Sequence, residues 1–128
     1  MNSEIAFYGQ RLLQEGRIIN ILADSSDEYG KKYRVELAGR EYQVKSGFAE
    51  LALNTGAAII PHYTTCLPDG RVQLNLLKPL EAGEGDRDEK IERLIGAYFA
   101  FINDVWVKNP EAIKWHRMEE HFSRDVFR

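Results

Sequence analysis

Two groups of residues in this sequence have the types and positions that acid–base or ligand chemistry needs. Asp24 and Asp27 follow directly after residues 17–23, an apolar and β-branched stretch, and His62 follows Pro61 at the end of a second such stretch. In open α/β sheets, ligands bind at the carboxyl ends of strands, which predicts a ligand site at both places. The alternative is that the aspartates only cap backbone groups and that His62 is a structural histidine.

The remaining nucleophilic and metal-ligating residue types are poorly placed for chemistry. His116 and His121 lie five residues apart, which separates them by about 140° around a helix and makes them a poor metal pair. Cys66 has no basic or histidine neighbour in its immediate sequence that would activate its thiol, so we expect it to be inert. The glycine-rich dinucleotide, P-loop and paired-cysteine motifs are absent. The sequence therefore predicts no metal and no cofactor.

Basic residues concentrate in the first third of the chain, although the protein as a whole is acidic. The formal net charge is −3, so no overall positive field favours nucleic acid. A local basic face could still meet a phosphate-bearing headgroup. The alternative is an ordinary solvated hairpin surface. The residues concerned are Arg17, Lys31, Lys32, Arg34, Arg40 and Lys45.

Length and composition limit the class of protein. The 128 residues, 44% of them apolar, suit one domain over residues 1–128 and are too few for two complete cores. No apolar run approaches the roughly 20 residues that a membrane-spanning helix requires. The first residues also lack the basic flank and apolar stretch of a signal peptide. We therefore expect a soluble, cytosolic domain.

The elements that must position these residues alternate between helices and strands. Apolar spacing, capping residues and turn signals predict their limits. Helices are expected over residues 3–15, 46–54 and 87–107, with a last one from Asn109, and strands over residues 17–23, 33–37, 41–44, 57–63 and 72–76. This order predicts an α/β fold with a mixed sheet of about four to five strands and helices packed on it.

Several stretches of the chain, taken together, resemble one protein family. They are residues 18–24, the hairpin ending at residues 38–40, the helix-to-proline stretch 46–61, the turn 67–71 and a closing Asn109-Pro-Glu-x-x-x-Trp115-His116. In this order they resemble the C-terminal half of the bacterial lipid A biosynthesis (lauroyl/myristoyl) acyltransferase family, in the lysophospholipid acyltransferase superfamily. The resemblance spans roughly residues 10–120 and implies a partial acyltransferase-like fold.

The resemblance implies a reaction, partners and a location. The family transfers an acyl chain from acyl-ACP or acyl-CoA to a hydroxyl of a glycolipid or lysophospholipid. It implies an acyl donor and a phosphorylated lipid acceptor as partners, and a cytoplasmic protein at the inner face of the membrane. Asp24 would match the acidic position of the family's third block, and Gly47, Gly56 and Pro61 its fourth block. The predicted ligand-binding residues are Asp24, Asp27, Arg40, Ser46, Gly47, Pro61 and His62.

The chain departs from the family at its catalytic pair. The family uses a histidine as general base on the acceptor hydroxyl, followed five residues later by Asp or Glu. Here His62 is followed at that distance by Leu67, His116 by His121, and His121 by Val126. No catalytic residue is therefore predicted. Since a general base contributes about 10²- to 10⁴-fold, we expect the chain to be ineffective alone. It is either part of a split or longer enzyme, in which a partner chain could carry the missing half, or a degenerate family member that keeps part of a ligand site.

Two other functions remain open. One is a non-enzymatic interaction module that pairs with itself or with a partner chain, and a weaker one is a small hydrolase that uses His62 with Asp24 or Asp27. An uncovered sheet edge and the aromatic residues of the long helix favour self-association. We therefore predict a homodimer that buries more than about 1,000 Å² in total. The aromatic residues are Tyr98, Phe99, Phe101 and Trp106.

Overall fold

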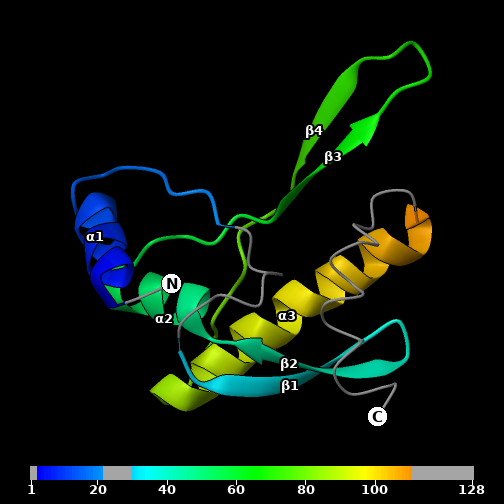
Figure 1. Cartoon of the computed structure of the whole chain (residues 1–128). Helices are drawn as coiled ribbons and strands as arrows, with labels where there is room; N and C mark the ends of the chain where they lie inside the picture. Colours follow the sequence, from blue (N-terminus) through cyan, green and yellow to red (C-terminus); the bar gives the residue numbers. More distant parts are fainter. Residues whose placement is uncertain (1–2, 22–29, 111–128) are drawn as a thin grey trace.

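The chain is a mixed α/β protein with three helices and two antiparallel strand pairs, in a computed structural model that describes residues 3–21 and 30–110 (Figure 1). In order, the elements are α1 (Ser3–Gln14), β1 (Lys32–Leu37), β2 (Arg40–Lys45), α2 (Gly47–Thr55), β3 (His62–Cys66), β4 (Val72–Leu76) and α3 (Arg87–Lys108). The predicted α/β class is confirmed. Asp24, Asp27 and the helix expected after Asn109 lie outside the described residues.

Helix α3 is the central element of the core. A capping box fixes its start: the Asp86 carboxylate accepts from the Glu89 N–H at 2.9 Å, and the Glu89 carboxylate accepts from the Asp86 N–H at 3.1 Å. Apolar residues then recur at helical spacing and are buried, as the periodicity predicts. They are Ile91, Leu94, Ile95, Phe99, Ile102 and Val105. The helix predicted over residues 87–107 is confirmed and is one residue longer.

The β1–β2 hairpin packs one face on α3 and turns the other to solvent. Burial alternates along β1, which contacts α3. The two-residue turn, Ala38 and Gly39, has φ values of 51° and 74°, the left-handed pair that tight hairpins use. Asn103 of α3 reaches this turn, where its Oδ1 accepts from the Ala38 N–H at 2.8 Å. The predicted hairpin is confirmed, and the helix holds its tip.

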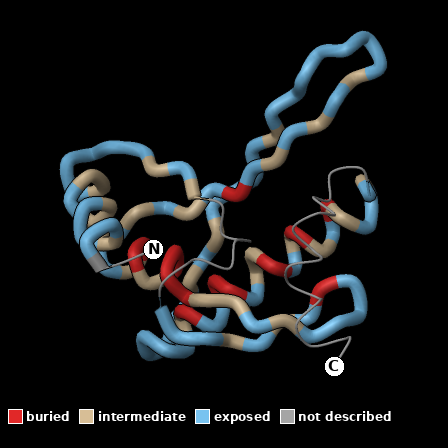
Figure 2. The backbone as a smooth tube through the Cα atoms, viewed as in Figure 1, coloured by how far each residue is buried: buried red, intermediate tan, exposed pale blue. Residues whose placement is uncertain are grey.

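Helix α2 follows β2 directly and completes the core. Phe48 and Ala49 are buried in the same cluster as the α3 residues, and α1 packs against α2. Figure 2 shows that buried positions gather on α2, on α3 and at the end of β1. Gly56 ends α2 with φ 71°, a left-handed conformation that glycine adopts without steric cost. None of the helices described here is long and apolar enough to cross a membrane.

The strands form two separate pairs, and not the mixed sheet of about four to five strands that the element order predicts. Among the described residues, β1 pairs only with β2 and β3 only with β4. Residues 17–21 and 57–61 belong to no strand, so the strands predicted over these residues are not confirmed. Apolar, β-branched runs look alike whether they pair in a sheet or lie against helices. Pro61 also lacks the N–H that a central strand donates.

The β3–β4 hairpin extends away from the helices (Figure 1). Strand β3 begins at His62, later than the predicted start at residue 57. The predicted turn at residues 68–70 is confirmed: Asp69 Oδ1 accepts from the Arg71 N–H at 3.1 Å, and Gly70 has φ 85°. The hairpin is therefore specified by its turn and joins no larger sheet in the described part of the chain.

Candidate functional site

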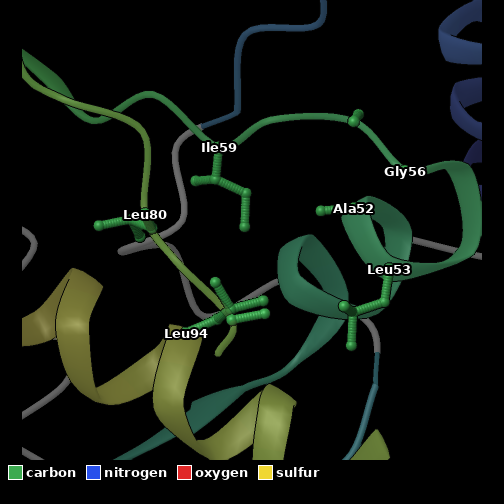
Figure 3. Close-up of a pocket in the computed structure, with 8 residues that line it drawn as sticks. Ala52, Leu53, Gly56, Ile59, Leu80 and Leu94 are labelled. Carbon is green, nitrogen blue, oxygen red and sulfur yellow. The ribbon is translucent and has the colours of Figure 1, made fainter. Parts of the chain in front are cut away.

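An apolar pocket of about 190 Å³ lies between α2, α3 and two connecting segments (Figure 3). Its walls come from the last turns of α2, the segment after Gly56, the connector before α3 and the first turns of α3. The side chains that line it include Ala52, Leu53, Ile59, Leu80 and Leu94. They are all aliphatic, so the pocket offers a ligand hydrophobic and dispersion contacts and no hydrogen-bonding side chain.

Backbone hydrogen bonds hold the two connecting segments at the pocket. Leu80 donates its N–H to the Ile59 carbonyl at 2.8 Å, and Leu77 donates to the Pro61 carbonyl at 3.0 Å. These bonds join the two segments below the hairpin, beyond the ends of the strands; the Pro61–Leu77 bond keeps the register of the hairpin, and the Ile59–Leu80 bond is shifted by one residue. One wall of the pocket is therefore an extension of the hairpin.

One arginine ties the connector before α3 to that helix. The Arg93 guanidinium donates to the Ala82 and Glu84 carbonyls, the latter at 2.9 Å. An added Cβ at Gly83 would lie 2.6 Å from Arg93 Nη1. Because φ at Gly83 is 69°, glycine suits both the backbone and the space there. Arg93 thus fixes the wall of the pocket that Ala82 belongs to.

Ser46 and Gly47 lie in the interior, where β2 meets α2. The Ser46 hydroxyl is fully buried; it accepts from the Lys31 N–H at 2.9 Å and donates to Glu50 Oε1 at 2.9 Å. A Cβ at Gly30 would lie 2.5 Å from this hydroxyl oxygen, so the chain before β1 passes directly against it. The Ser46 side chain makes no N-cap bond to α2, because the Ser46 backbone is itself helical (φ −82°, ψ 0°). The hydroxyl instead links the residue that precedes β1 to α2.

Pro61 and His62 lie at the base of the β3–β4 hairpin. Pro61 is buried, whereas His62 is exposed and its Nε2 lies 3.0 Å from Asn20 Oδ1. An amide oxygen only accepts hydrogen bonds, so this contact is a hydrogen bond in the tautomer of His62 that carries a proton on Nε2. Within the described residues, the interaction made by His62 is therefore with an amide and not with the carboxylate that a general base needs.

Arg40 is exposed at the start of β2, at the opposite end of that strand from Ser46. A strand rises about 3.3 Å per residue, so roughly 20 Å separate the two positions. Nearby, burial raises the pKa of Tyr42 to about 12, and the positive charge of Arg40 opposes the rise. The described members of the predicted ligand set thus lie at three places: Arg40 at the turn of the first hairpin, Ser46 and Gly47 in the interior before α2, and Pro61 and His62 at the base of the second hairpin.

The exposed side of the β1–β2 hairpin carries part of the basic face predicted from the sequence. Lys32 stands directly opposite Lys45, and Arg34 forms an exposed ion pair with Glu41 at 3.4 Å. Like charges opposite each other destabilise a strand pair, so a bound anion would stabilise this end of the hairpin. No cluster of metal-ligating side chains occurs over residues 3–21 and 30–110, and Cys66 is an exposed free thiol.

The residues that line the pocket are absent from the ligand set predicted from the sequence. They come from four separate segments, and each has the spacing of ordinary core residues. The one available signal is Gly56, which turns the chain so that Ile59 faces Ala52 (Figure 3). A pocket assembled in this way is visible only after the segments are placed in space.

Comparison with known proteins gives no relative for this chain. No family model, no curated protein and no solved structure matches it. Its function is therefore inferred from its own residues and geometry.

Proposed function

We propose that this chain is an acyltransferase-like domain that binds the hydrocarbon part of an acyl donor or lipid acceptor and does not catalyse transfer alone. The observation that carries the proposal is the aliphatic pocket beside residues 46–61, the stretch that resembles the acyltransferase family. Hydrocarbon is stabilised by about 25 cal/mol for each Å² of apolar surface that it buries. None of the described residues that line the pocket carries a charge that would oppose this.

The size of the pocket sets what it can hold. Sites for whole drug-sized ligands measure roughly 300–1,000 Å³, and this pocket measures about 190 Å³. It accommodates the end of an acyl chain and leaves the thioester or the headgroup outside. The proposed donor is acyl-ACP or acyl-CoA and the proposed acceptor is a phosphorylated lipid at the inner face of the membrane.

Catalysis requires a second chain in this proposal. His62 is followed five residues later by Leu67 and contacts Asn20, so it lacks the acid of the family's catalytic pair. The partner chain would supply a His-x4-Asp/Glu pair and strands that complete a mixed sheet of about four to five strands. Acyl transfer from a labelled acyl carrier, assayed with and without such a chain, checks this: we expect turnover only from the mixture.

The pocket itself is tested by binding of a fluorescent lauroyl probe. Ala57 lines the pocket, while its neighbour Ala58 is exposed and does not. Ala57→Phe should fill the pocket and weaken binding at least about tenfold, or about 1.4 kcal/mol. Ala58→Phe adds the same bulk outside the pocket and should bind the probe like the wild type. Equal affinities of the two variants would contradict an acyl site here.

A second candidate function is a non-enzymatic interaction module. It is favoured by the apolar side chains that α1 leaves exposed: Ile5, Phe7 and Tyr8 are 53%, 78% and 58% exposed. Large apolar side chains left exposed on one short helix are candidates for contact with a partner protein. Failure of the lauroyl probe to bind the wild type, together with a stable complex in solution, would favour this function over the first.

A further inference from the structure

The β3–β4 hairpin has two uncovered edges. Neither strand pairs with another element in the described part of the chain, and the hairpin extends away from the helices (Figure 1). An isolated two-stranded hairpin is marginally stable in water, whereas three or more strands with an apolar face are stable. This hairpin therefore gains from an additional strand.

The two faces of the hairpin differ in polarity. Val72, Leu74 and Leu76 of β4 share one face and are 67%, 58% and 67% exposed. The opposite face carries Tyr63, whose ring lies 6.0 Å from that of Phe101 on α3. Tyr63 thus contacts the body of the protein from this opposite face, while the aliphatic side chains of β4 are left to solvent.

The backbone N–H and C=O groups of the same three residues face the open edge of β4. At the two ends of the hairpin, Leu67 donates to the Arg71 carbonyl at 2.8 Å and Leu77 to the Pro61 carbonyl at 3.0 Å. Antiparallel bonding alternates along a strand, so the odd-numbered residues of β4 bond to β3. The N–H and C=O groups of the even-numbered residues, 72, 74 and 76, therefore face the free edge.

The first hairpin shows how an edge is protected, and β4 lacks that protection. Strands β1 and β2 carry a charged residue at about every second position, among them Lys32, Arg34 and Glu36. Charged side chains, prolines and bulges are the usual means of blocking edge-to-edge pairing. Strand β4, Val-Gln-Leu-Asn-Leu, contains no charged residue and no proline, and it is regularly paired with β3 over its whole length.

We propose that β4 pairs antiparallel with β4 of a second copy of this chain, across a two-fold axis at Leu74. In this register Leu74 lies opposite Leu74 of the second copy, and Val72 lies opposite Leu76. The result is a four-stranded antiparallel sheet, β3–β4–β4–β3, whose two central strands form an aliphatic stripe on one face, flanked by His62, Thr64 and Cys66 of each β3. The inference is independent of the acyl pocket, since β4 contributes no residue to it.

The sequence of β4 favours a second copy as the occupant because the strand is complementary to itself. With Leu74 at the axis, aliphatic residues meet aliphatic residues, and Gln73 meets Asn75 on the other face. The nearest charged position, Arg71, meets Leu77, so no like charges are placed opposite each other. A two-fold pairing satisfies both copies at once and closes without exposing a new equivalent edge.

Sedimentation tests the pairing at tens of micromolar protein. The wild type should be a dimer, and Leu74→Lys, which places two lysines face to face at the axis, should be a monomer with an unchanged circular dichroism spectrum. Gln43→Lys adds the same charge on β2 and should remain a dimer. A monomeric wild type, or a dimer that survives Leu74→Lys, would overturn the proposal in favour of another partner or another surface.

Cross-linking tests the register without relying on a charged variant. In a Cys66→Ser background, Leu74→Cys places two thiols opposite each other at a Cα separation of about 5.5 Å, within the range of a disulfide. Added diamide, which takes up the two electrons and two protons, should link this variant into a covalent dimer. Gln73→Cys in the same background should link at least about tenfold more slowly, because its counterpart lies two residues away across the axis. Equal linking would overturn the register.

Discussion

Ser46 illustrates how a single hydroxyl joins two elements. It is completely buried and hydrogen-bonds the Lys31 N–H and the Glu50 carboxylate. Ser46→Ala leaves both groups without this partner and should lower the free energy of unfolding by about 1–3 kcal/mol. Glu50→Gln keeps an oxygen that accepts the hydroxyl proton and should lower it by less than about 1 kcal/mol. Urea unfolding measures the free energy of unfolding of both variants, provided that its dependence on urea concentration is the same as in the wild type. Equal unfolding midpoints for Ser46→Ala and the wild type would contradict this role of the hydroxyl.

Tyr42 gives the stability of the protein a defined dependence on alkaline pH. Burial raises the pKa of Tyr42 from 10.0 to about 12. The unfolded state therefore loses this proton first, so the contribution of Tyr42 is complete below pH 10 and is lost as the pH rises toward 12. The melting temperature of the wild type should fall over that range relative to Tyr42→Phe, since other groups titrate in both proteins. A constant difference between the two proteins would contradict the raised pKa.

At the scale of the element, the β1–β2 turn stores strain that a substitution can relieve. Ala38 has φ 51°, which is unfavourable for a residue with a β-carbon, and it is exposed. Asn-Gly is the preferred pair for this turn, so Ala38→Asn should stabilise the protein by up to about 1 kcal/mol. Gly39→Ala should destabilise it by about 1–2 kcal/mol through the backbone alone, since nothing lies within 4 Å of the added carbon. Thermal unfolding of the two variants should shift in opposite directions.

Local signals predicted the elements of this fold better than their assembly. Helix α3 shows apolar residues at regular spacing, and the two hairpin turns use Gly39 and Gly70, so nearby residues were sufficient to place all three. The predicted mixed sheet is not confirmed, because residues 57–61 have the composition of a buried strand but lie against α2 and α3 in the structure. Which surface covers an apolar run depends on residues far away in sequence, and no local pattern contains that information.

At the scale of the whole molecule, the candidate site also depends on contacts between distant segments that local sequence patterns do not reveal. Strand ends and the family resemblance together predict the ligand set, and the structure places Arg40, Ser46 and His62 in the first hairpin, the interior and the second hairpin. The pocket forms where α2, α3 and two connectors converge, and its residues carry no chemical signal of their own. Aliphatic residues predict a core whether or not the core is completely filled, so sequence reasoning could not separate this pocket from ordinary packing.

The chain leaves the core before the β3–β4 hairpin and returns to it at nearly the same point. Hydrogen bonds of 3.0 and 2.8 Å join Pro61 to Leu77 and Ile59 to Leu80, so the hairpin is an insertion between α2 and α3. The conformational entropy lost when a loop of this kind is closed grows only logarithmically with the number of residues in the loop. The segment between these ties can therefore be lengthened, shortened or exchanged during evolution with little effect on how α2 packs against α3. Its base is a natural place for the chain to acquire new modules.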